Sequence, residues 1–443
     1  MQVEHALQGL AAHIERLDPV RPVGRVNSVS GGLIEISGVP DARIGQQIRL
    51  PRRGRAPLTG EIVRLENGSA HAMPDQVAEH VSIGDRVTIL PAVSLAPSDS
   101  WKGRVIDPNG KPLDGKPLLP GVTLMTLQGA PPAARSRMSM GRRLDTGLAV
   151  TNTFLPIVSG QRLGLFANAG LGKSSLIAML AQGLEADVVV IALIGERGHE
   201  VSHFTDSVLG PEAMQRCVVV AATSDQPALH RRRCAWSAMT VAEYFRAQGK
   251  NVLLLADSMT RFADAHREVA SAAGELPVLR GYPASVAPML MSLCERAGPG
   301  PEGEGHITGL FSVLVPGEDM DEPISDILRG TLDGHIILGR DIAARGRFPA
   351  IDVLQSVSRS LPGAASDAEN ALLSEARRLL SVYDTNAAMI RAGLYSKGTD
   401  AEIDRAIAFW PEAEAFLARQ EAGGCEDSFK HLELALRRSG RDR

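Results

Sequence analysis

The chain has 443 residues, of which 44% are hydrophobic and 22% charged, and its formal net charge is −4. This is the composition of a globular protein with room for two or three domains, and the slightly acidic balance gives no general electrostatic reason to bind nucleic acid. Four widely spaced cysteines argue against a disulfide scaffold or a zinc site, and without a signal peptide or a long apolar run we expect a cytoplasmic protein, with docking at a membrane surface left open.

The first predicted element is a helix over residues 1–18, which prolines then end. Its apolar residues are three or four positions apart and form one stripe: Val3, Leu7, Leu10, Ile14 and Leu17. Over residues 19–95, short Val, Ile and Leu stretches alternate with Gly, Pro, Asn and Asp, which predicts a small β-barrel or sandwich. At the end of this predicted domain, residues Val93–Ser100 have the composition of a linker.

Residues 96–367 alternate strand and helix patterns, which predicts a parallel sheet with helices on both faces. Helices are expected at Ala228–Gln248 and Met259–Ala272, and Gly298–Gly305 is so rich in Gly and Pro that we expect an exposed, mobile loop. A mainly helical domain should follow over residues 368–443. The predicted strands are Arg162–Phe166, Asp187–Ile194, Cys217–Ala221, Asn251–Ala256, Gly309–Val315 and His335–Leu338.

The first of these strands leads into a loop of small residues, and a helical pattern follows at once. Small side chains let successive backbone N–H groups wrap around a phosphate, to which the helix N-terminus adds its positive dipole end. Lys173 can reach the β- and γ-phosphates, and the Ser174 hydroxyl can ligate Mg²⁺. Ala167 stands where such loops usually begin with Gly. We therefore predict a site for a nucleoside triphosphate with Mg²⁺, made of Ala167, Asn168, Ala169, Gly170, Leu171, Gly172, Lys173, Ser174 and Ser175.

Three further residues could complete the chemistry. Asp257 follows the apolar stretch Val252–Leu255 and fits the Walker B role of holding Mg²⁺, usually through water. Glu196, at the end of another predicted strand, could orient the attacking water, although a surface ion pair with Arg197 fits its spacing equally well. Arg359 could supply a cation to the transition state, but from spacing alone an ordinary surface arginine is the better interpretation.

Longer segments of the central region carry a more specific pattern: Leu193–Gly198, Ala222–Leu229, Val252–Arg261, Leu332–Arg340 and Arg347–Asp352. Together they resemble the export ATPases of bacterial flagella and type III secretion systems, which are relatives of the rotary ATP synthase β subunit. Arg143–Gly147 and Asn152–Phe154 resemble the flagellar branch more than the injectisome branch.

The resemblance implies a RecA-like core between an N-terminal β-barrel and a C-terminal helical domain, assembled as a homohexamer that hydrolyses Mg-ATP at subunit interfaces to energise export of flagellar proteins. It implies that Glu196 is the catalytic carboxylate and that Arg359 acts in trans as an arginine finger. Phe348 would stack on adenine, where relatives often have Tyr. His199 stands where relatives commonly have Arg, which would make a contact near the site sensitive to pH.

The resemblance also implies partners. The acidic loop Gly317–Glu322 would face a central channel and a coiled-coil stalk; its alternative is a solvated turn. The N-terminal stripe would bind a regulatory partner that carries the ATPase to the inner-membrane face of the export apparatus; its alternative is docking on the chain's own barrel. Export-gate membrane proteins, exported substrates and chaperones would be further partners.

Other function classes fit less well. Hexameric RNA translocases share the RecA-like core, but the first Phe, Tyr or Trp here is Trp101, so the N-terminal domain has no platform for stacking bases. The basic run Arg231–Arg233 is more typical of a solvated or interface surface than of a phosphate track, and we expect no nucleic-acid partner. A purely structural nucleotide-binding subunit would lack Glu196. An injectisome ATPase is kept as the alternative, and a rotary ATP synthase subunit as a weaker one.

Overall fold

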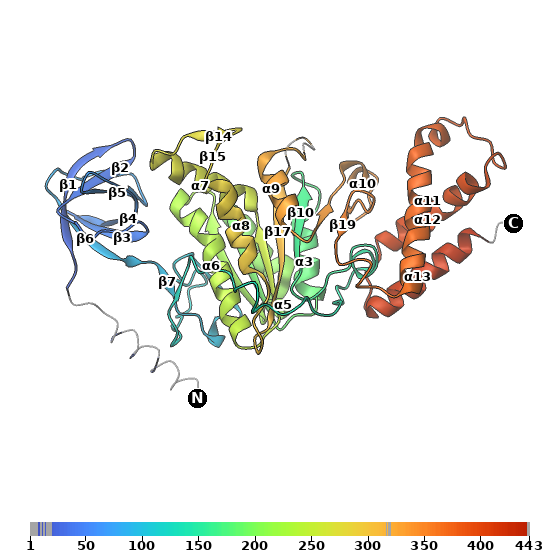
Figure 1. Ribbon diagram of the computed structural model, residues 1–443, viewed down its shortest axis with the longest axis horizontal. Helices are drawn as coiled ribbons and strands as arrows, with labels where there is room; N and C mark the ends of the chain where they lie inside the picture. Colours follow the sequence, from blue (N-terminus) through green and yellow to red (C-terminus); the bar gives the residue numbers. More distant parts are fainter. Residues whose placement is uncertain are drawn as a thin grey trace. The chain divides into compact units, whose positions relative to one another are not determined.

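The computed structural model describes residues 8, 11, 14, 20–315, 317 and 320–440. The chain forms two compact units, each built from several segments (Figure 1). Of the predicted N-terminal stripe only Ile14 is described, as an exposed side chain, and the rest lies outside the described residues. Unit 1 comprises Met1–Pro132, Val188–Gln248 and Ala256–Arg296; unit 2 comprises Ala133–Asp187, Gly249–Leu255 and Ala297–Arg443.

Unit 1 contains a closed, antiparallel barrel of six strands, coloured blue in Figure 1. Its order is β1-β2-β5-β4-β3-β6, and β1 pairs with β6 to close it. Alternate side chains point inward, so that residues such as Ile34, Ile48 and Leu58 form a dry core. The predicted barrel is confirmed. Its strands are β1 Val23–Ser30, β2 Leu33–Ser37, β3 Gln46–Arg52, β4 Arg55–Glu66, β5 Ser69–Pro74 and β6 Arg86–Ala92.

The rest of unit 1 is α/β. Parallel strands follow the order β13-β11-β12-β8, where β13 (Val252–Asp257) contributes its last two residues to this unit. Strand β11 (Val188–Glu196) is buried from Val188 through Gly195, as its unbroken apolar run predicts. The long helices are α6 Ala228–Ala247, α7 Met259–Ala272 and α8 Val286–Arg296. The other elements are β7 Ser94–Leu95, η1 Asp99–Trp101, β8 Arg104–Ile106, β9 Met125–Thr126, α4 Gly198–His203, η2 Phe204–Leu209, α5 Gly210–Met214, β12 Cys217–Thr223, β14 Pro277–Leu279 and β15 Tyr282–Pro283.

One expectation for unit 1 is wrong: the predicted linker Val93–Ser100 contains β7, which pairs with β9, and its Leu95 is buried. The basic run on α6 was expected to be a solvated or an interface surface, and Arg232 and Arg233 are in fact buried. Glu61 of β4 accepts hydrogen bonds from the two guanidinium groups, at 2.8 and 2.6 Å. One barrel carboxylate therefore compensates two buried cations on α6.

Unit 2 holds the other part of the α/β region. Its strand order is β19-β18-β10-β17-β13, with the first four residues of β13. Strand β10 is parallel to both β17 and β18, and β19 returns antiparallel to β18. The elements are α2 Ala149–Asn152, β10 Arg162–Ala167, α3 Lys173–Gly183, β16 Gly298–Pro299, β17 His306–Leu314, α9 Pro323–Thr331, β18 Gly334–Ile337, α10 Arg340–Ala344 and β19 Val357–Ser358.

The predicted exposed loop Gly298–Gly305 is only in part a loop. Gly298 and Pro299 form β16, paired antiparallel with β17, and both are buried. Gly305 is buried as well, and a Cβ placed on it would lie 1.9 Å from the Lys250 carbonyl oxygen. These glycines therefore serve close backbone packing rather than mobility, and the prediction is wrong for both ends of the segment.

The C-terminal part of unit 2 is helical, as predicted, with α11 Asp367–Arg391, α12 Ala401–Leu417 and α13 Gly424–Ser439 packed on one another and on α2 (Figure 1). Ser366 and Asp400 cap α11 and α12 through their side-chain oxygens. The Asn152 amide donates a 3.0 Å hydrogen bond to Ser428, which joins α2 to α13. The predicted fold class, a RecA-like α/β core with a β-barrel and a helical domain, is confirmed.

Within the described part of the chain, no helix combines the length and the apolar character that a membrane crossing requires. All four cysteines are buried, and none of them forms a disulfide bond. Burial raises the pKa of the Cys217 thiol to about 11.

Candidate functional site

The predicted phosphate loop lies in unit 2, at the end of a buried strand. Ala167 is the last residue of β10, and α3 begins at Lys173. Gly170 and Gly172 have φ angles of 81° and 83°, in the left-handed region that other residues rarely adopt. Ala167 has no positive φ, so an alanine is accommodated at the position where glycine is usual. The loop conformation therefore depends on the two glycines that the sequence retains.

The N-terminus of α3 follows directly on the loop. Its N-cap is Gly172, which has no side chain to cap the first turn, and Ser174 and Ser175 are exposed. Leu176, Ile177 and Leu180 bury the opposite face of this 11-residue helix and fix its direction. Its first backbone N–H groups carry the positive end of the helix dipole, which suits a phosphate.

Phe348 lies next to this loop within unit 2. A Cβ placed on Gly172 would be 3.4 Å from Cδ1 of the Phe348 ring, and the side chain is 49% exposed. A half-exposed aromatic ring beside a phosphate loop offers a flat apolar face on which a base could stack.

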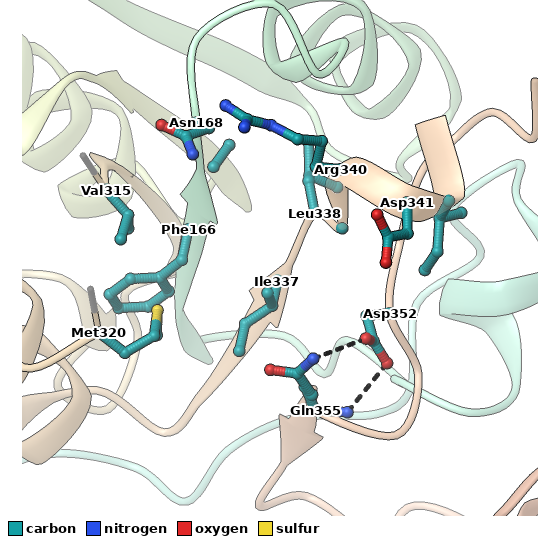
Figure 2. Close-up of a pocket in the computed structure, with 13 residues that line it drawn as sticks. Phe166, Asn168, Val315, Met320, Ile337, Leu338, Arg340, Asp341, Asp352 and Gln355 are labelled. Carbon is teal, nitrogen blue, oxygen red and sulfur yellow. Dashed lines mark hydrogen bonds between the residues drawn. The ribbon is translucent and has the colours of Figure 1, made fainter. Parts of the chain in front are cut away.

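A pocket of about 150 Å³ opens at the base of the loop, lined by Ala167 and Asn168 among others. Figure 2 shows the Arg340 side chain extending toward Asn168, with apolar side chains such as Phe166 and Ile337 forming another wall. Asn168 Nδ2 is buried and has no hydrogen-bond partner among the described residues. The loop is therefore backed by a small space that still contains an unsatisfied donor.

The candidate catalytic carboxylate lies in unit 1. Glu196 ends β11, and its side chain is 15% exposed. Nη1 of Arg261 lies 3.4 Å from Glu196 Oε2 and also donates to the Gly195 carbonyl oxygen. Arg197 lies 3.7 Å from Glu200.

Arg261 is the residue near the site that the sequence analysis missed. It occupies the first turn of α7, which starts two residues after Asp257, and its backbone N–H donates to the capping Ser258 Oγ at 3.5 Å. An arginine one turn after an acid at a strand end is a signal that could have found it.

Glu200 forms a second carboxyl group beside Glu196. It accepts a hydrogen bond from the Arg197 N–H at 3.3 Å and so caps α4. A hydrogen bond from the Glu196 carboxyl, more than the neighbouring Arg197 charge, lowers the pKa of Glu200. His199, between Glu196 and Glu200 in sequence, is exposed.

Asp257 is the last residue of β13, because the strand extends one residue beyond its predicted end at Ala256. Its side chain is buried, with 3% exposed. Carboxylate and hydroxyl oxygens such as those of Asp257 and Ser174 are the donors that Mg²⁺ accepts. In the described ranges, no group of three His, Cys, Asp or Glu side chains could by itself hold a metal ion.

Arg359 is exposed and follows β19 in unit 2. Its guanidinium makes one long contact, 3.5 Å, to the Arg329 carbonyl oxygen. The structure thus groups the phosphate loop, Phe348 and Arg359 in unit 2, and Glu196, Asp257 and Arg261 in unit 1.

The predicted acidic loop Gly317–Glu322 is described only in part, because Glu318 and Asp319 lie outside the described residues. Asp321 pairs with Arg329 at 3.7 Å, and the Glu322 carboxylate caps α9 by accepting from two backbone N–H groups.

Comparison with known proteins gives consistent matches. Residues 147–358 match the nucleotide-binding domain of the ATP synthase alpha/beta family, and residues 365–433 match the T3SS EscN ATPase C-terminal domain. The chain is 45% identical over 440 residues to a flagellum-specific ATP synthase of Caulobacter vibrioides, covering 97% of this chain and 99% of that protein. It is 40% identical over 403 residues to the SPI-2 type 3 secretion system ATPase of Salmonella typhimurium, covering 91% and 92%.

Solved structures of a type III secretion ATPase are similar to this chain as well. The assembled ATPase EscN of the enteropathogenic E. coli type III secretion system superposes with a TM-score of 0.86 at 34% identity, covering 93% of this chain and 100% of that one. EscN in complex with its central stalk EscO gives 0.84 at the same identity and coverage.

Proposed function

Since this chain belongs to the family of flagellar and type III secretion export ATPases, which is related to the ATP synthase alpha/beta family, we propose that it hydrolyses Mg-ATP to energise export of flagellar proteins. The observation that carries this proposal is the phosphate loop, with two left-handed glycines, an available helix N-terminus and Phe348 beside it. An injectisome ATPase is the alternative, supported by the 40% identity to the Salmonella enzyme. Secretion of flagellin by a strain that lacks the gene, with and without complementation, tests the flagellar assignment.

We assign roles as follows. Backbone N–H groups from Ala167 to Ser175 would bind the phosphates, with Lys173 on the β- and γ-phosphates. Ser174 and Asp257 would hold Mg²⁺, which neutralises the charge that develops on the phosphates. Glu196 would orient the attacking water, and Phe348 would stack on adenine. Arg261, in contact with Glu196, would fix that carboxylate at the end of β11.

Assembly follows from the same proposal. We propose a homohexamer in which the exposed Arg359 reaches the nucleotide of the neighbouring subunit, in keeping with the assembled form of EscN. The complex of EscN with its central stalk EscO supports a coiled-coil stalk in a central channel, near the acidic loop 317–322. We place the protein in the cytoplasm at the inner-membrane face of the export apparatus, with export-gate proteins, substrates and chaperones as further partners and functional boundaries after residues 18, 95 and 367.

The first prediction concerns Lys173. Lys173→Ala removes the phosphate-binding cation, so nucleotide affinity should fall by about 10- to 100-fold, the effect of losing a charged hydrogen bond, and ATP turnover should be lost. Binding of labelled ATP and release of phosphate measure the two effects. Lys397→Ala, at an exposed lysine, is the matched control and should match the wild type. Normal affinity and turnover in Lys173→Ala would contradict the assigned role of the loop.

The second prediction concerns residues 1–18. A lone helix of this length is marginal in water, so its stripe should be ordered only against a partner. Deleting the segment should leave nucleotide binding and the melting temperature of the remaining chain nearly unchanged and abolish capture of a regulatory protein. A large drop in melting temperature with capture retained would instead mean that the stripe packs on the chain's own barrel.

A further inference from the structure

In unit 2, a network of hydrogen bonds joins Gln161 to Ser358 and Asp333, which adjoin or contact the backbone of Arg359. Its centre is Gln161, which precedes β10 and is 0% exposed. Gln161 Oε1 accepts from the Val158 N–H at 3.0 Å. Gln161 Nε2 donates to Ser358 Oγ at 3.0 Å and, more weakly, to the Asp333 carbonyl oxygen at 3.4 Å. Both ends of the amide are therefore engaged, and the donating end faces the residue just before Arg359.

The Ser358 hydroxyl is one partner of Gln161 in this network. Its Oγ accepts from the Gln161 amide N–H and lies 2.7 Å from the Pro156 carbonyl oxygen and 2.9 Å from Ser360 Oγ, either of which can accept its proton. Ser358 lies opposite Gly334 in the β18–β19 pair. A Cβ on Gly334 would be 2.4 Å from the Val357 carbonyl oxygen, so β19 lies tightly against β18. Ser358 is thus held by the pairing of β19 with β18 and by the hydrogen bond from the Gln161 side chain.

Asp333 holds the next residue. Its carbonyl oxygen accepts from the Arg359 N–H at 3.0 Å. Its carboxylate accepts from the Arg162 Nε at 3.1 Å, from Nη2 at 3.2 Å and from the Arg162 backbone N–H at 3.0 Å. The Arg359 backbone N–H is therefore held by Asp333, which is itself held by Arg162, while the Arg359 guanidinium is exposed with one long contact.

We propose that Gln161 is a positioning residue for Arg359: its contacts with Ser358 and Asp333 fix the point from which the guanidinium extends toward the neighbouring subunit's nucleotide. This inference rests on the proposed action of Arg359 in trans. A cation that must meet a transferring phosphoryl group needs a well-defined origin, because a misplacement of about 1 Å can cost about 100-fold in rate.

Gln161 could instead act on its own phosphate loop, since it stands at the start of β10. The contacts argue otherwise. The bonds from its Nε2 go to Ser358 and Asp333, and the loop begins six residues further on. The strand between them is held by its backbone pairing with β17 and β18. The two roles predict opposite results when variant subunits are mixed.

The direct test is Gln161→Met, which keeps the length of the side chain and removes its hydrogen bonds. The turnover number should fall about 10- to 100-fold, while ATP affinity stays within about twofold of the wild type. Ser358→Ala removes the same contact from the other side and should give the same pattern. The two substitutions share the loss of the Gln161–Ser358 bond, so the loss of rate in the double variant should be smaller than the product of the two single losses.

The matched control is Ser356→Ala. Ser356 is 1% exposed, lies two residues before Ser358, and bonds to the Asp352 carbonyl oxygen and the Ile337 N–H instead of Gln161. Its turnover should stay within about twofold of the wild type. A loss equal to that of Ser358→Ala would overturn the role of the Gln161–Ser358 contact. Melting temperature and ring assembly are measured for every variant, and a weaker ATP affinity or a lost ring in both Gln161→Met and Ser358→Ala would also overturn it.

Rings mixed from two variants show whether Gln161 acts, through Arg359, on the neighbouring subunit's nucleotide site or on the phosphate loop of its own subunit. Lys173→Ala subunits lack a working loop but supply Arg359, whereas Arg359→Ala subunits keep the loop and lack the cation. Gln161→Met should regain activity with Lys173→Ala and none with Arg359→Ala. The reverse pattern, or recovery with neither partner, would overturn the inference.

A reference mixture of Arg359→Ala with Lys173→Ala tests the action of Arg359 in trans separately from the positioning role of Gln161. Recovery in rings of Arg359→Ala with Lys173→Ala supports action in trans, and failure of Gln161→Met then counts against Gln161 alone. Absence of recovery in the reference mixture, in rings shown to be mixed, would overturn the role of Arg359 and with it the inference.

Discussion

Replacing Glu196 with Gln should stop ATP hydrolysis and spare nucleotide binding. The amide has the size of the carboxylate but no negative charge, so it cannot polarise the attacking water, and the turnover number should fall by about 10²- to 10⁴-fold. Arg261 would lose its ionic partner 3.4 Å away but keep its bond to the Gly195 carbonyl oxygen, so the local fold should persist. Phosphate release under single-turnover conditions and binding of labelled ATP measure the two quantities.

The control for this variant is Glu200→Gln, the same change four residues on. Glu200 caps α4 through its side chain and has no assigned role at the phosphates, so its substitution should lower the turnover number much less than Glu196→Gln does. Near-normal turnover in Glu196→Gln would move the water-positioning role to another residue, and a larger loss in Glu200→Gln would move it there.

Arg359→Ala should give the largest loss of rate without loss of binding. Arginine fingers contribute about 10³- to 10⁵-fold in related phosphoryl transfers. Because the cation would act across a subunit interface, wild-type activity should rise more steeply than linearly with protein concentration as rings form. Arg391→Ala, at the exposed end of α11, removes a surface arginine outside the proposed site and should leave the rate unchanged.

Mixing Arg359→Ala with Lys173→Ala tests the trans geometry directly. A mixed ring contains places where an intact loop adjoins a subunit with an intact arginine, so part of the activity should return. Activity that remains linear in concentration, or a mixed ring without recovery, would make Arg359 an ordinary surface residue.

Local patterns predicted most of the fold. The apolar run of β11 and the small-residue loop before α3 are features of adjacent residues, so the sequence alone reveals them. The burial of Arg232 and Arg233 could not be seen in the same way, because their partner Glu61 is 171 and 172 residues away. The packing of Gly305 on Lys250 is likewise a contact between distant segments.

In the candidate site, too, features of adjacent residues could be predicted from the sequence, whereas contacts between distant residues could not. The phosphate loop is continuous in sequence, so its residues and its position between β10 and α3 could be predicted from adjacent residues alone. Arg261 was missed because its significance lies in its distance from Glu196, 65 positions earlier. The roles of Glu196 and Arg359 stay predictions, since one concerns a water molecule and the other a second copy of the chain.

The shared carboxylate of Glu61 limits how freely the barrel can be exchanged between proteins. Arg232 and Arg233 belong to α6, yet the negative charge that makes their burial tolerable comes from β4. A truncated enzyme that starts after residue 95 would leave two cations of α6 without this counterion, exposed where the barrel had covered them. A chimera that joins this core to a foreign barrel would therefore have to bring an acid at the position of Glu61, and the barrel is better regarded as part of the α6 folding unit than as a detachable module.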